Sequence, residues 1–357
     1  MELTVEKLVT GCKGLSRTKE GRVVLLDGVL PGEVVDLSPS GAVSVLSPSP
    51  DRLAPLCPYY GRCGGCGFQI VTAEKSALLK EEIVKENLSR LGGVREIPPF
   101  LPPAWGSFEG YRHRVRFHGR DGKAGFLEKG SNAFVEVESC PMLSKGLNAL
   151  LSEKKRLRSK LLEKPEAQAF EGDEEISLGE KPVKITAGGI SYQVSAEVFF
   201  QSNPSLLPQL LCFVKENARG PVIMDLYSGV GTFSALFPDM EVYAVERDRA
   251  CLRLSRLNAP HARSYTADVA EWKKRKGIIP DTVIVDPPRA GLSLKALTLI
   301  AGWESPRIIY VSCDSASASR DIGRLKSYRI TKARVFDFYP GSSHEESAFV
   351  LDRVSCT

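Results

Sequence analysis

The stretch that decides the fold runs from residue 307 to residue 314 and reads RIIYVSCD. Two similar apolar runs precede it, TVIVDPPR at 282–289 and VIMDLYSGVG at 222–231. Each reads as a buried strand that ends in a polar or Gly/Pro-rich loop, a pattern typical of an open parallel sheet. Because ligands bind at the carboxyl ends of strands in such sheets, Cys313 is a candidate nucleophile. The alternative is a buried structural cysteine.

The composition is that of a globular protein. The chain has 357 residues, of which 43% are hydrophobic and 25% charged, enough for two or three domains. No apolar run approaches the ~20 residues of a membrane helix, and the first residues lack the apolar core of a signal peptide. We therefore expect a cytoplasmic monomer without membrane contact. The net charge of +5 permits nucleic-acid binding without requiring it.

The pattern of short elements predicts three domains. Residues 1–53 alternate short β-like runs with Gly/Pro turns, which predicts a small β-barrel that either binds nucleic acid or is structural. An amphipathic helix is predicted at 72–91, within a central α+β domain at 54–190. From about residue 205 helices and strands alternate, which predicts a Rossmann-like α/β catalytic domain at 191–357.

The run YRHRVRF at 111–117 reads as a strand. With the two-residue period of a strand, Arg112, Arg114 and Arg116 would share one face. Three guanidinium groups in a row suit phosphate groups, although a merely solvated strand face has the same pattern. These arginines are therefore candidate RNA-binding residues.

A cofactor site is predicted around a glycine-rich turn. Gly229 and Gly231 allow the backbone to approach a ligand closely, and Glu246 at the end of the next strand suits ribose hydroxyl groups. A further acid, Asp268, lies where the third strand should end and suits an adenine amino group. The second half of a dinucleotide fingerprint is missing, which favours S-adenosylmethionine, a cofactor without a pyrophosphate.

A thiol beside a methyl donor suggests methylation of a pyrimidine at carbon-5. Attack of a thiolate on carbon-6 gives an enolate, carbon-5 takes the methyl group, and a base then removes the carbon-5 proton. The loop from Asp286 to Arg289 contains two prolines and is rigid enough to hold a base. His344, Glu345 and Glu346 are all candidates for the proton acceptor, unless they belong to an exposed polar loop.

Five motifs resemble, in the same order, those of the S-adenosylmethionine-dependent RNA uridine-5 methyltransferases. They are FFQSN at 199–203, DLYSGVGTF at 225–233, DPPR at 286–289, YVSC at 310–313 and the final His344-x-Glu346. The resemblance covers most of the chain. It departs from the family after the cysteine, where Asp314 and Ser315 replace the usual Asn-Pro.

The resemblance implies roles for individual residues. Cys313 would be the nucleophile, Glu346 the carbon-5 base and Arg289 an RNA contact. The pocket for the cofactor and the target base would contain Gln201, Asp225, Tyr227, Gly229, Gly231, Glu246, Asp268 and Asp286.

Four cysteines form a possible metal site, namely Cys57, Cys63, Cys66 and the distant Cys140. Four thiolates without histidine suit zinc or an iron–sulfur cluster, and spacing alone does not decide between them. In the ribosomal-RNA branch of the resembled family these positions hold a 4Fe–4S cluster, so the resemblance implies one here.

The first 53 residues resemble the small RNA-binding barrel called TRAM, on the motifs Pro31-Gly32-Glu33 and Ser49-Pro50-x-Arg52. The barrel and the cluster cysteines together favour 23S ribosomal RNA as the substrate. Transfer RNA is the alternative, because some cluster-bearing relatives act on it.

Three other interpretations fit the sequence less well. A radical S-adenosylmethionine methylthiotransferase would have Cys-x3-Cys-x2-Cys, whereas this chain has spacings of five and two. A 5-methylcytosine methyltransferase typically has a proline before its nucleophile, and here Ser312 stands there. A non-catalytic RNA-binding protein would have no need of both Cys313 and Glu346.

Overall fold

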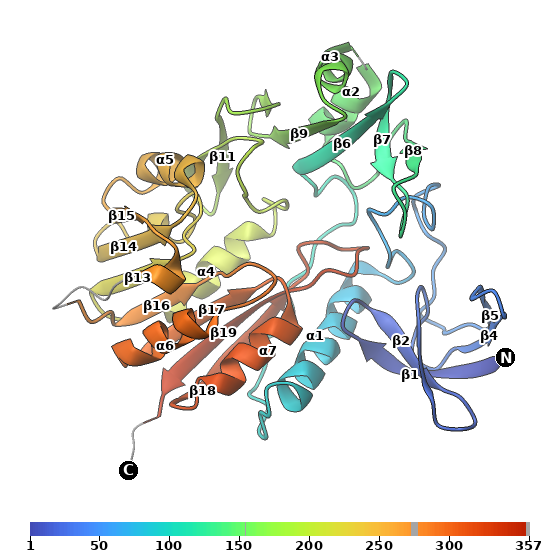
Figure 1. Ribbon diagram of the computed structural model, residues 1–357, viewed down its shortest axis with the longest axis horizontal. Helices are drawn as coiled ribbons and strands as arrows, with labels where there is room; N and C mark the ends of the chain where they lie inside the picture. The colour runs from blue at the N-terminus through green and yellow to red at the C-terminus, as the bar shows by residue number, and fades with distance from the viewer. Residues whose placement is uncertain (154, 273–277, 355–357) are drawn as a thin grey trace.

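The fold was analysed in a computed structural model, which describes residues 1–153, 155–272 and 278–354. Three sheet-based units are visible in Figure 1: an N-terminal sheet at lower right, a central sheet at the top and a large C-terminal sheet at lower left. Helix α1 (Ala73–Arg90) lies between the N-terminal and C-terminal units and contacts β1, β18 and α7.

The C-terminal sheet has seven strands in the order β15-β14-β13-β16-β17-β19-β18. Its first five strands are parallel, and β19 runs antiparallel between β17 and β18. The elements of this unit are β13 (Val222–Leu226), η1 (Ser234–Leu236), β14 (Glu241–Glu246), α5 (Arg249–Asn258), β15 (Arg263–Thr266), η2 (Val269–Glu271), β16 (Thr282–Val285), α6 (Leu294–Trp303), β17 (Arg307–Ser312), α7 (Ser315–Arg324), β18 (Tyr328–Phe336) and β19 (Glu346–Arg353). The predicted Rossmann-like domain is confirmed.

Both faces of this sheet are buried, as the unbroken apolar strands predict. Alternate residues of each strand point to opposite faces. Ile284 and Ile309 join the core shared with α4 (Leu207–Asn217) and α5, whereas Val283 and Ile308 join the core shared with α1, α6 and α7.

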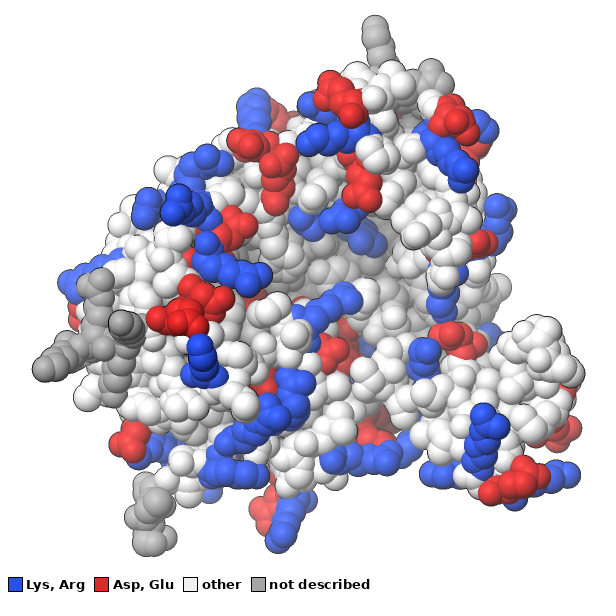
Figure 2. All heavy atoms as spheres, viewed as in Figure 1, with Lys and Arg blue, Asp and Glu red and all other residues white. Residues whose placement is uncertain are grey.

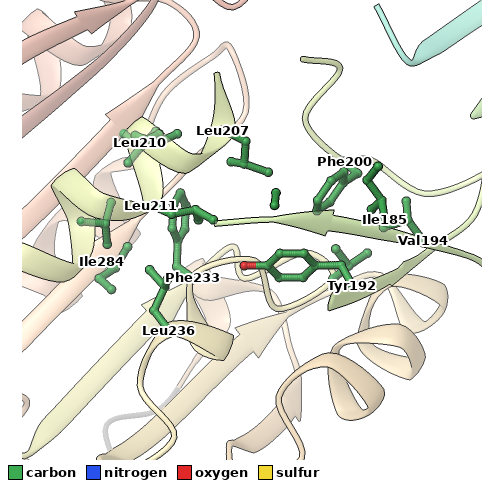
Figure 3. Packing of buried hydrophobic residues seen from close by; sticks show 14 of the residues in the cluster. Ile185, Tyr192, Val194, Phe200, Leu207, Leu210, Leu211, Phe233, Leu236 and Ile284 are labelled. Atoms are coloured by element: carbon green, nitrogen blue, oxygen red, sulfur yellow. The ribbon is translucent and has the colours of Figure 1, made fainter. Parts of the chain in front are cut away.

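The hairpin of β11 (Val183–Ala187) and β12 (Ile190–Val194) belongs to the C-terminal core. Figure 3 shows Ile185, Tyr192 and Val194 of this hairpin in one cluster with Leu207 and Ile284. The predicted domain boundary between residues 190 and 191 therefore cuts through a hairpin that packs as one piece on the C-terminal unit. The Gly188-Gly189 turn marks the hairpin in the sequence but not the domain to which it belongs.

The N-terminal unit is the predicted strand-rich domain. Its strands β1 (Glu2–Val9), β2 (Lys13–Arg17), β3 (Val23–Leu26), β4 (Val34–Leu37) and β5 (Val43–Ser47) pair in the order β3-β2-β1-β4-β5. The buried Glu33 carboxylate accepts hydrogen bonds from Arg52 Nη2 (2.7 Å) and from the Leu30 backbone N–H (2.8 Å). This ion pair fastens the segment after β5 to the β3–β4 turn.

The central sheet has the order β10-β9-β6-β7-β8 and is covered by two helices. Its elements are β6 (Arg114–Arg120), β7 (Lys123–Leu127), β8 (Phe134–Glu136), α2 (Lys145–Glu153), α3 (Lys155–Glu163), β9 (Glu166–Glu171) and β10 (Ile176–Ser177). The strand predicted to begin at Tyr111 begins at Arg114, because the backbone of Arg112 pairs instead with Leu143 and that of His113 with Ser202 and Glu171.

The three predicted RNA-binding arginines consequently do not form one free face. Arg114 is partly buried and donates to Gln168 Oε1 at 2.9 Å, and burial lowers the pKa of its guanidinium. Arg116 is exposed and lies 3.4 Å from a Glu166 oxygen. Arg112 donates to the backbone oxygen of Arg114 at 3.1 Å.

Among the described residues, no helix has both the length and the apolar character needed to cross a membrane.

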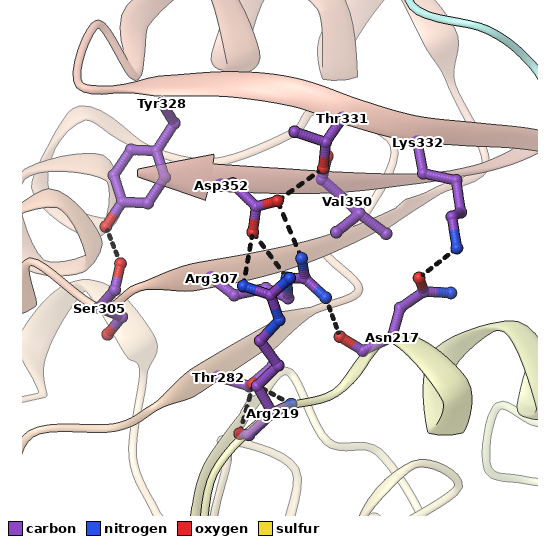
Figure 4. Close-up of polar contacts among 10 residues, drawn as sticks. All are labelled: Asn217, Arg219, Thr282, Ser305, Arg307, Tyr328, Thr331, Lys332, Val350 and Asp352. Carbon is purple, nitrogen blue, oxygen red and sulfur yellow. Dashed lines mark hydrogen bonds and ion pairs between the residues drawn. The ribbon is translucent and has the colours of Figure 1, made fainter. Parts of the chain in front are cut away.

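A polar cluster joins the beginning of β17 to the end of β19, which lie side by side because the two strands are antiparallel. Arg307 forms a fork with Asp352, with distances of 2.7 Å from Nε to Oδ1 and 2.8 Å from Nη2 to Oδ2 (Figure 4). Nη1 of Arg307 donates to the backbone oxygen of Asn217, and Asp352 also accepts from Thr331. Since Arg307 and Asp352 are direct partners across the two strands, the fork locks their register.

We predict that Arg307→Ala lowers the free energy of unfolding by about 3 kcal/mol, because it leaves a partly buried carboxylate without its bidentate partner. Chemical denaturation measures this loss. Lys295→Ala, which breaks the exposed Lys295–Glu271 pair, is the matched control and should leave the denaturation midpoint unchanged. Equal effects of the two substitutions would contradict the prediction.

Candidate active site

A cavity of about 450 Å³ opens at the carboxyl ends of the parallel strands. Its wall comes from the loops after β13, β14, β15, β16 and β17 and from the first residue of β19. The predicted site residues that line it are Gln201, Tyr227, Gly229, Glu246, Asp268, Asp286, Arg289, Cys313 and Glu346. The structure thus brings together motifs that are more than 140 residues apart in the sequence.

One half of the cavity is built by the loops after β13 and β14. The backbone N–H of Gly229 donates to Glu246 Oε2 at 3.0 Å, and the N–H of Asp248 donates to Glu246 Oε1 at 2.7 Å. Gly229 has a φ of 54°, a left-handed conformation that glycine adopts without strain. Tyr227 has a φ of 60°, a conformation that is strained for a residue with a side chain and is characteristic of functional loops. The carboxylate of Glu246 is thereby held at the cavity wall, as a ribose contact requires.

Two predicted cofactor-binding residues do not line the cavity. Asp225 is fully buried beneath it and accepts a hydrogen bond from Ser234 Oγ at 2.5 Å. Gly231 has a φ of 83°, and a Cβ atom there would lie 2.8 Å from Ser255 Oγ. Both residues support the loop that forms the cavity wall, and Oδ1 of Asp225 has no hydrogen-bond partner among the described residues, so their assignment to the cofactor site stays a prediction.

Sequence reasoning missed the apolar part of the wall. Phe199, Phe233 and Val269 line the cavity, and Phe199 leaves 54% of its surface exposed at the rim. An aromatic side chain with this exposure beside a cleft suits stacking against a planar ligand. The signal was present, because Phe199 begins one of the family-like motifs.

The other half of the cavity contains the thiol and two carboxyl groups. Strand β17 pairs with β19 so that Ser312 lies opposite Ser347. One position beyond this pair, Cys313 follows Ser312 and Glu346 precedes Ser347. The register therefore places Cys313 and Glu346 side by side at the cavity. Asp286 lies on the neighbouring β16 loop and completes the group.

The electrostatics of these groups favour their protonated forms. Burial, followed by the charges of Glu346 and Asp286, raises the pKa of the Cys313 thiol to about 12. Enclosure by protein raises the pKa of Asp286 to about 7, although part of this side chain faces the cavity. Burial, and then the charge of Asp286, raises the pKa of Glu346 well above its usual range. Among the groups that shift the pKa of Cys313, Arg289 is the positively charged one, and it lowers that pKa.

The three candidate proton acceptors have different surroundings. Burial, and then Arg289, lowers the pKa of His344 to about 4, and its Nδ1 lies 3.1 Å from Nη2 of Arg289. Glu345 accepts from the backbone N–H of Ser315 at 3.2 Å and points away from the cavity lining. Glu346 lines the cavity, and its Oε1 atom is buried without a hydrogen-bond partner among the described residues. The geometry therefore favours Glu346 as the proton acceptor.

Gln201 contributes a second unpaired polar atom. Its side chain is 4% exposed, and Oε1 has no partner among the described residues although it lies at the cavity. A buried oxygen without a donor is costly unless a ligand supplies one.

A second cavity, of about 370 Å³, gathers the four predicted metal ligands. Cys57, Cys63, Cys66 and Cys140 all line it, and each is a free thiol. Burial raises the pKa of Cys66 to about 11, and the positive charge of Arg112 lowers it. The described residues contain no group of three ligands already at metal-binding separation.

The surface near these cavities is hollowed and partly basic. Figure 2 shows a depression between the three units, with lysine and arginine side chains along its rim. Arg112 and Arg116 line the cysteine cavity, and Arg289 lines the larger cavity. The basic residues predicted to bind RNA are thus distributed over two domains.

Comparisons with known proteins agree with this geometry. Residues 248–354 match the family described as tRNA (Uracil-5-)-methyltransferase. The chain is 28% identical to the 23S rRNA (uracil(1939)-C(5))-methyltransferase RlmD of Alkalilimnicola ehrlichii, over 99% of this chain and 96% of the relative. An uncharacterized RNA methyltransferase of Thermotoga maritima is 26% identical over 98% of both chains.

A solved structure has the same fold along almost the whole chain. The Pyrococcus abyssi tRNA (uracil-54, C5)-methyltransferase in complex with S-adenosyl-L-homocysteine superposes with a TM-score of 0.77 and 21% identity. The superposition covers 98% of this chain and 100% of that chain. Together with the order of the motifs, these matches show that the chain is similar to RNA uracil-5 methyltransferases over nearly its whole length.

We predict that the two charges beside Cys313 tune its alkylation in opposite directions. Glu346 raises the pKa of the thiol, so Glu346→Gln should lower that pKa. At any pH below the pKa, the fraction of Cys313 present as thiolate should then increase. Arg289→Ala should raise the pKa of Cys313 and decrease its thiolate fraction, because Arg289 lowers that pKa. Alkylation by iodoacetamide at pH 8, followed by peptide mass spectrometry, should be several-fold faster in the first variant and slower in the second.

The exposed Cys212 is the internal control for this experiment, because it lies outside the cavity beside Glu216. Its alkylation rate should be the same in all three proteins. If both substitutions shift the rate at Cys313 in the same direction, the assigned electrostatics are wrong.

Proposed function

We propose that the protein transfers a methyl group from S-adenosylmethionine to carbon-5 of a uridine in 23S ribosomal RNA, through a covalent bond between Cys313 and carbon-6. The observation that carries the proposal is the placement of Cys313 and Glu346 at the ends of paired strands in one cavity. Relatives named for this activity on 23S rRNA match nearly the full chain, which supports ribosomal over transfer RNA.

The order of events follows from the groups in the cavity. The Cys313 thiol loses its proton as its sulfur attacks carbon-6, and the electron pair of the carbon-5–carbon-6 double bond moves into an enolate. The bound cofactor supplies the methyl group that carbon-5 takes up. Glu346 then removes the carbon-5 proton, the double bond re-forms, and sulfur leaves as thiolate.

The high pKa of Cys313 sets a requirement for the first step. At neutral pH the thiol is protonated, so its proton must move to a neighbouring acceptor when the substrate binds. Asp286 and Glu346 are the carboxyl groups that interact with this sulfur, and we assign the thiol proton to Asp286, so that the Glu346 carboxylate remains free to accept the carbon-5 proton. We assign Asp286 the further role of holding the target base, together with Gln201, whose unpaired oxygen suits an N–H donor.

The target uridine must leave its stack to reach Cys313, so an unpaired or loop uridine is the expected substrate. We assign the phosphate contacts to Arg112, Arg116 and Arg289 and to the N-terminal sheet acting as a TRAM-like domain. These contacts weaken with salt because binding releases counterions. We further propose that the protein acts as a monomer in the cytoplasm.

The test is methyl transfer to unmodified 23S rRNA and, separately, to unmodified transfer RNA. We expect 5-methyluridine in the ribosomal RNA alone. Cys313→Ala should abolish transfer while binding of S-adenosylmethionine persists, because the glycine-rich wall is intact. Transfer to tRNA alone would reject the ribosomal substrate, and full activity of Cys313→Ala would reject the mechanism.

We predict that Glu346→Gln accumulates a methylated covalent RNA complex. Without the carboxylate, release of the adduct should slow by about 100-fold or more, whereas attack by Cys313 is retained. Denaturing gels with labelled RNA detect the complex. The double variant Cys313→Ala/Glu346→Gln is the control and should show none. Normal turnover by Glu346→Gln would transfer the role of base to His344 or Glu345.

We also propose a 4Fe–4S cluster at the four-cysteine cavity, with zinc as the alternative. The donor set fits the group, because four free thiols line one cavity and Arg112 supplies positive charge beside them. Cys57, Cys63, Cys66 and Cys140 would hold the cluster. Methyl transfer needs no electron, so the cluster would organise the loop of residues 57–66 for RNA contact.

The anaerobically purified protein should contain about four irons per chain. Cys66→Ala should lose most of this iron, whereas Cys212→Ala, at an exposed site away from the cavity, should keep it. Elemental analysis and the visible absorption spectrum provide the measurement. Zinc in place of iron would contradict the assignment.

A further inference from the structure

Two residues flank the reacting pair and are joined to each other. Ser315 follows Cys313 by two positions and is the first residue of α7, while Glu345 directly precedes Glu346 and β19. Both side chains are buried, with exposures of 0% and 4%. Neither residue lines the cavity.

The connection between them is a directed hydrogen-bond chain. Ser315 donates both its hydroxyl and its backbone N–H to Oε1 of Glu345, the latter at 3.2 Å. The hydroxyl oxygen accepts in turn from Nδ2 of Asn87 at 2.7 Å. Burial raises the pKa of Glu345, and the two hydrogen bonds from Ser315 act in the opposite direction and favour its carboxylate form.

The chain continues into the N-terminal unit. Asn87 lies on α1, and its Nδ2 also donates to Oγ1 of Thr10 in the β1–β2 turn at 3.0 Å. Hydrogen bonds therefore link the N-terminal sheet, α1, the loop of the thiol and the loop of the base.

The pairing of β17 with β19 does not by itself hold the reacting groups, although Glu346 also pairs with Phe336 of β18. The last pair between β17 and β19 is Ser312 with Ser347, so Cys313 lies just beyond the paired end of its strand. Glu346 is the first residue of β19 and stands at the same end. The two groups act on adjacent atoms of one pyrimidine ring, and a misplacement of about 1 Å costs about 100-fold in rate.

We propose that the Ser315–Glu345 bond, supported by Asn87, is a clamp that sets the separation of Cys313 and Glu346 during the reaction. The inference rests on the proposed function, because it assigns both flanked residues to catalysis. Ser315 and Glu345 are positioning residues. Ser315 supplies both an N–H and a hydroxyl group to this clamp, and a proline at this position would supply neither.

The first experiment removes the serine hydroxyl. Ser315→Ala should lower kcat for methyl transfer about ten-fold, with the Michaelis constant for RNA and the affinity for S-adenosylmethionine unchanged. Ser319→Ala is the matched control, because Ser319 lies on the same helix, is fully buried, and has no partner for its hydroxyl among the described residues. Thermal unfolding of both variants establishes that they are folded.

The second experiment tests whether the two residues act as one unit. Glu345→Ala should lower kcat at least as much as Ser315→Ala, and Glu345→Gln should restore part of it because an amide oxygen still accepts from Ser315. The double variant Ser315→Ala/Glu345→Ala should be no slower than Glu345→Ala alone. Additive losses would overturn the clamp.

A third measurement needs no RNA. Loss of the clamp should raise the alkylation rate of Cys313 several-fold relative to that of Cys212, and Ser319→Ala should leave the ratio unchanged. If Ser315→Ala matches Ser319→Ala in both kcat and alkylation while the wild type is active, the clamp is overturned. A different outcome is that the wild type transfers no methyl group although Ser315→Ala still raises the alkylation rate of Cys313. In that case the proposed function and the role of the clamp in catalysis are both rejected. The effect of the Ser315–Glu345 bond on the position of Cys313 would nevertheless be established.

Discussion

The arrangement of the candidate active site depends on the antiparallel pairing of β17 with β19. Strand side chains alternate between faces, so a slip of one residue would turn Glu346 away from the cavity that contains Cys313. The register is fixed at the far end by the Arg307–Asp352 fork and along the strands by buried apolar pairs such as Ile309 with Val350. Strand β19 runs antiparallel to β17, so its first residue lies beside the last residues of β17. This arrangement brings the carboxyl group of Glu346 close to the thiol of Cys313, which is more than 30 residues earlier in the sequence.

The cavity concentrates groups whose burial is unfavourable for folding. Enclosure raises the pKa values of Cys313, Asp286 and Glu346, so each group is shifted toward its neutral form. Gln201 and Glu346 each retain a buried oxygen without a partner among the described residues. Such an arrangement is costly in the free protein and is satisfied by a ligand that brings N–H donors. The single N–H of a uracil ring would satisfy one of these two oxygens, which is consistent with the proposed binding of a flipped base.

Sequence patterns predicted the elements well because the signals are local. Apolar runs ending in Gly/Pro-rich loops located the strands that carry Gly229, Asp286 and Cys313, and the helix at 72–91 followed from its period. The orientation of individual side chains was harder, since it depends on partners far along the chain. Asp225 accepts a hydrogen bond from Ser234, and Arg114 donates one to Gln168, and no local sequence pattern predicts either contact. Likewise, three adjacent candidates for the base could be told apart only once strand register and pairing were known.

Helix α1 connects the N-terminal sheet to the C-terminal unit that contains the candidate active site. Helix α1 carries Lys80, whose fully buried ammonium group lies 2.6 Å from Asp337 Oδ1 at the end of β18, with Ser76 donating to the other oxygen. A buried ion pair of this kind contributes less to net stability than to fixing one arrangement of its neighbours. The same helix contacts β1 on its other side. An RNA bound across the N-terminal sheet and the basic rim, as proposed above, would lie against a frame that includes the loops of Cys313 and Glu346. One set of contacts would then set both the position of the substrate and the geometry of the candidate catalytic groups.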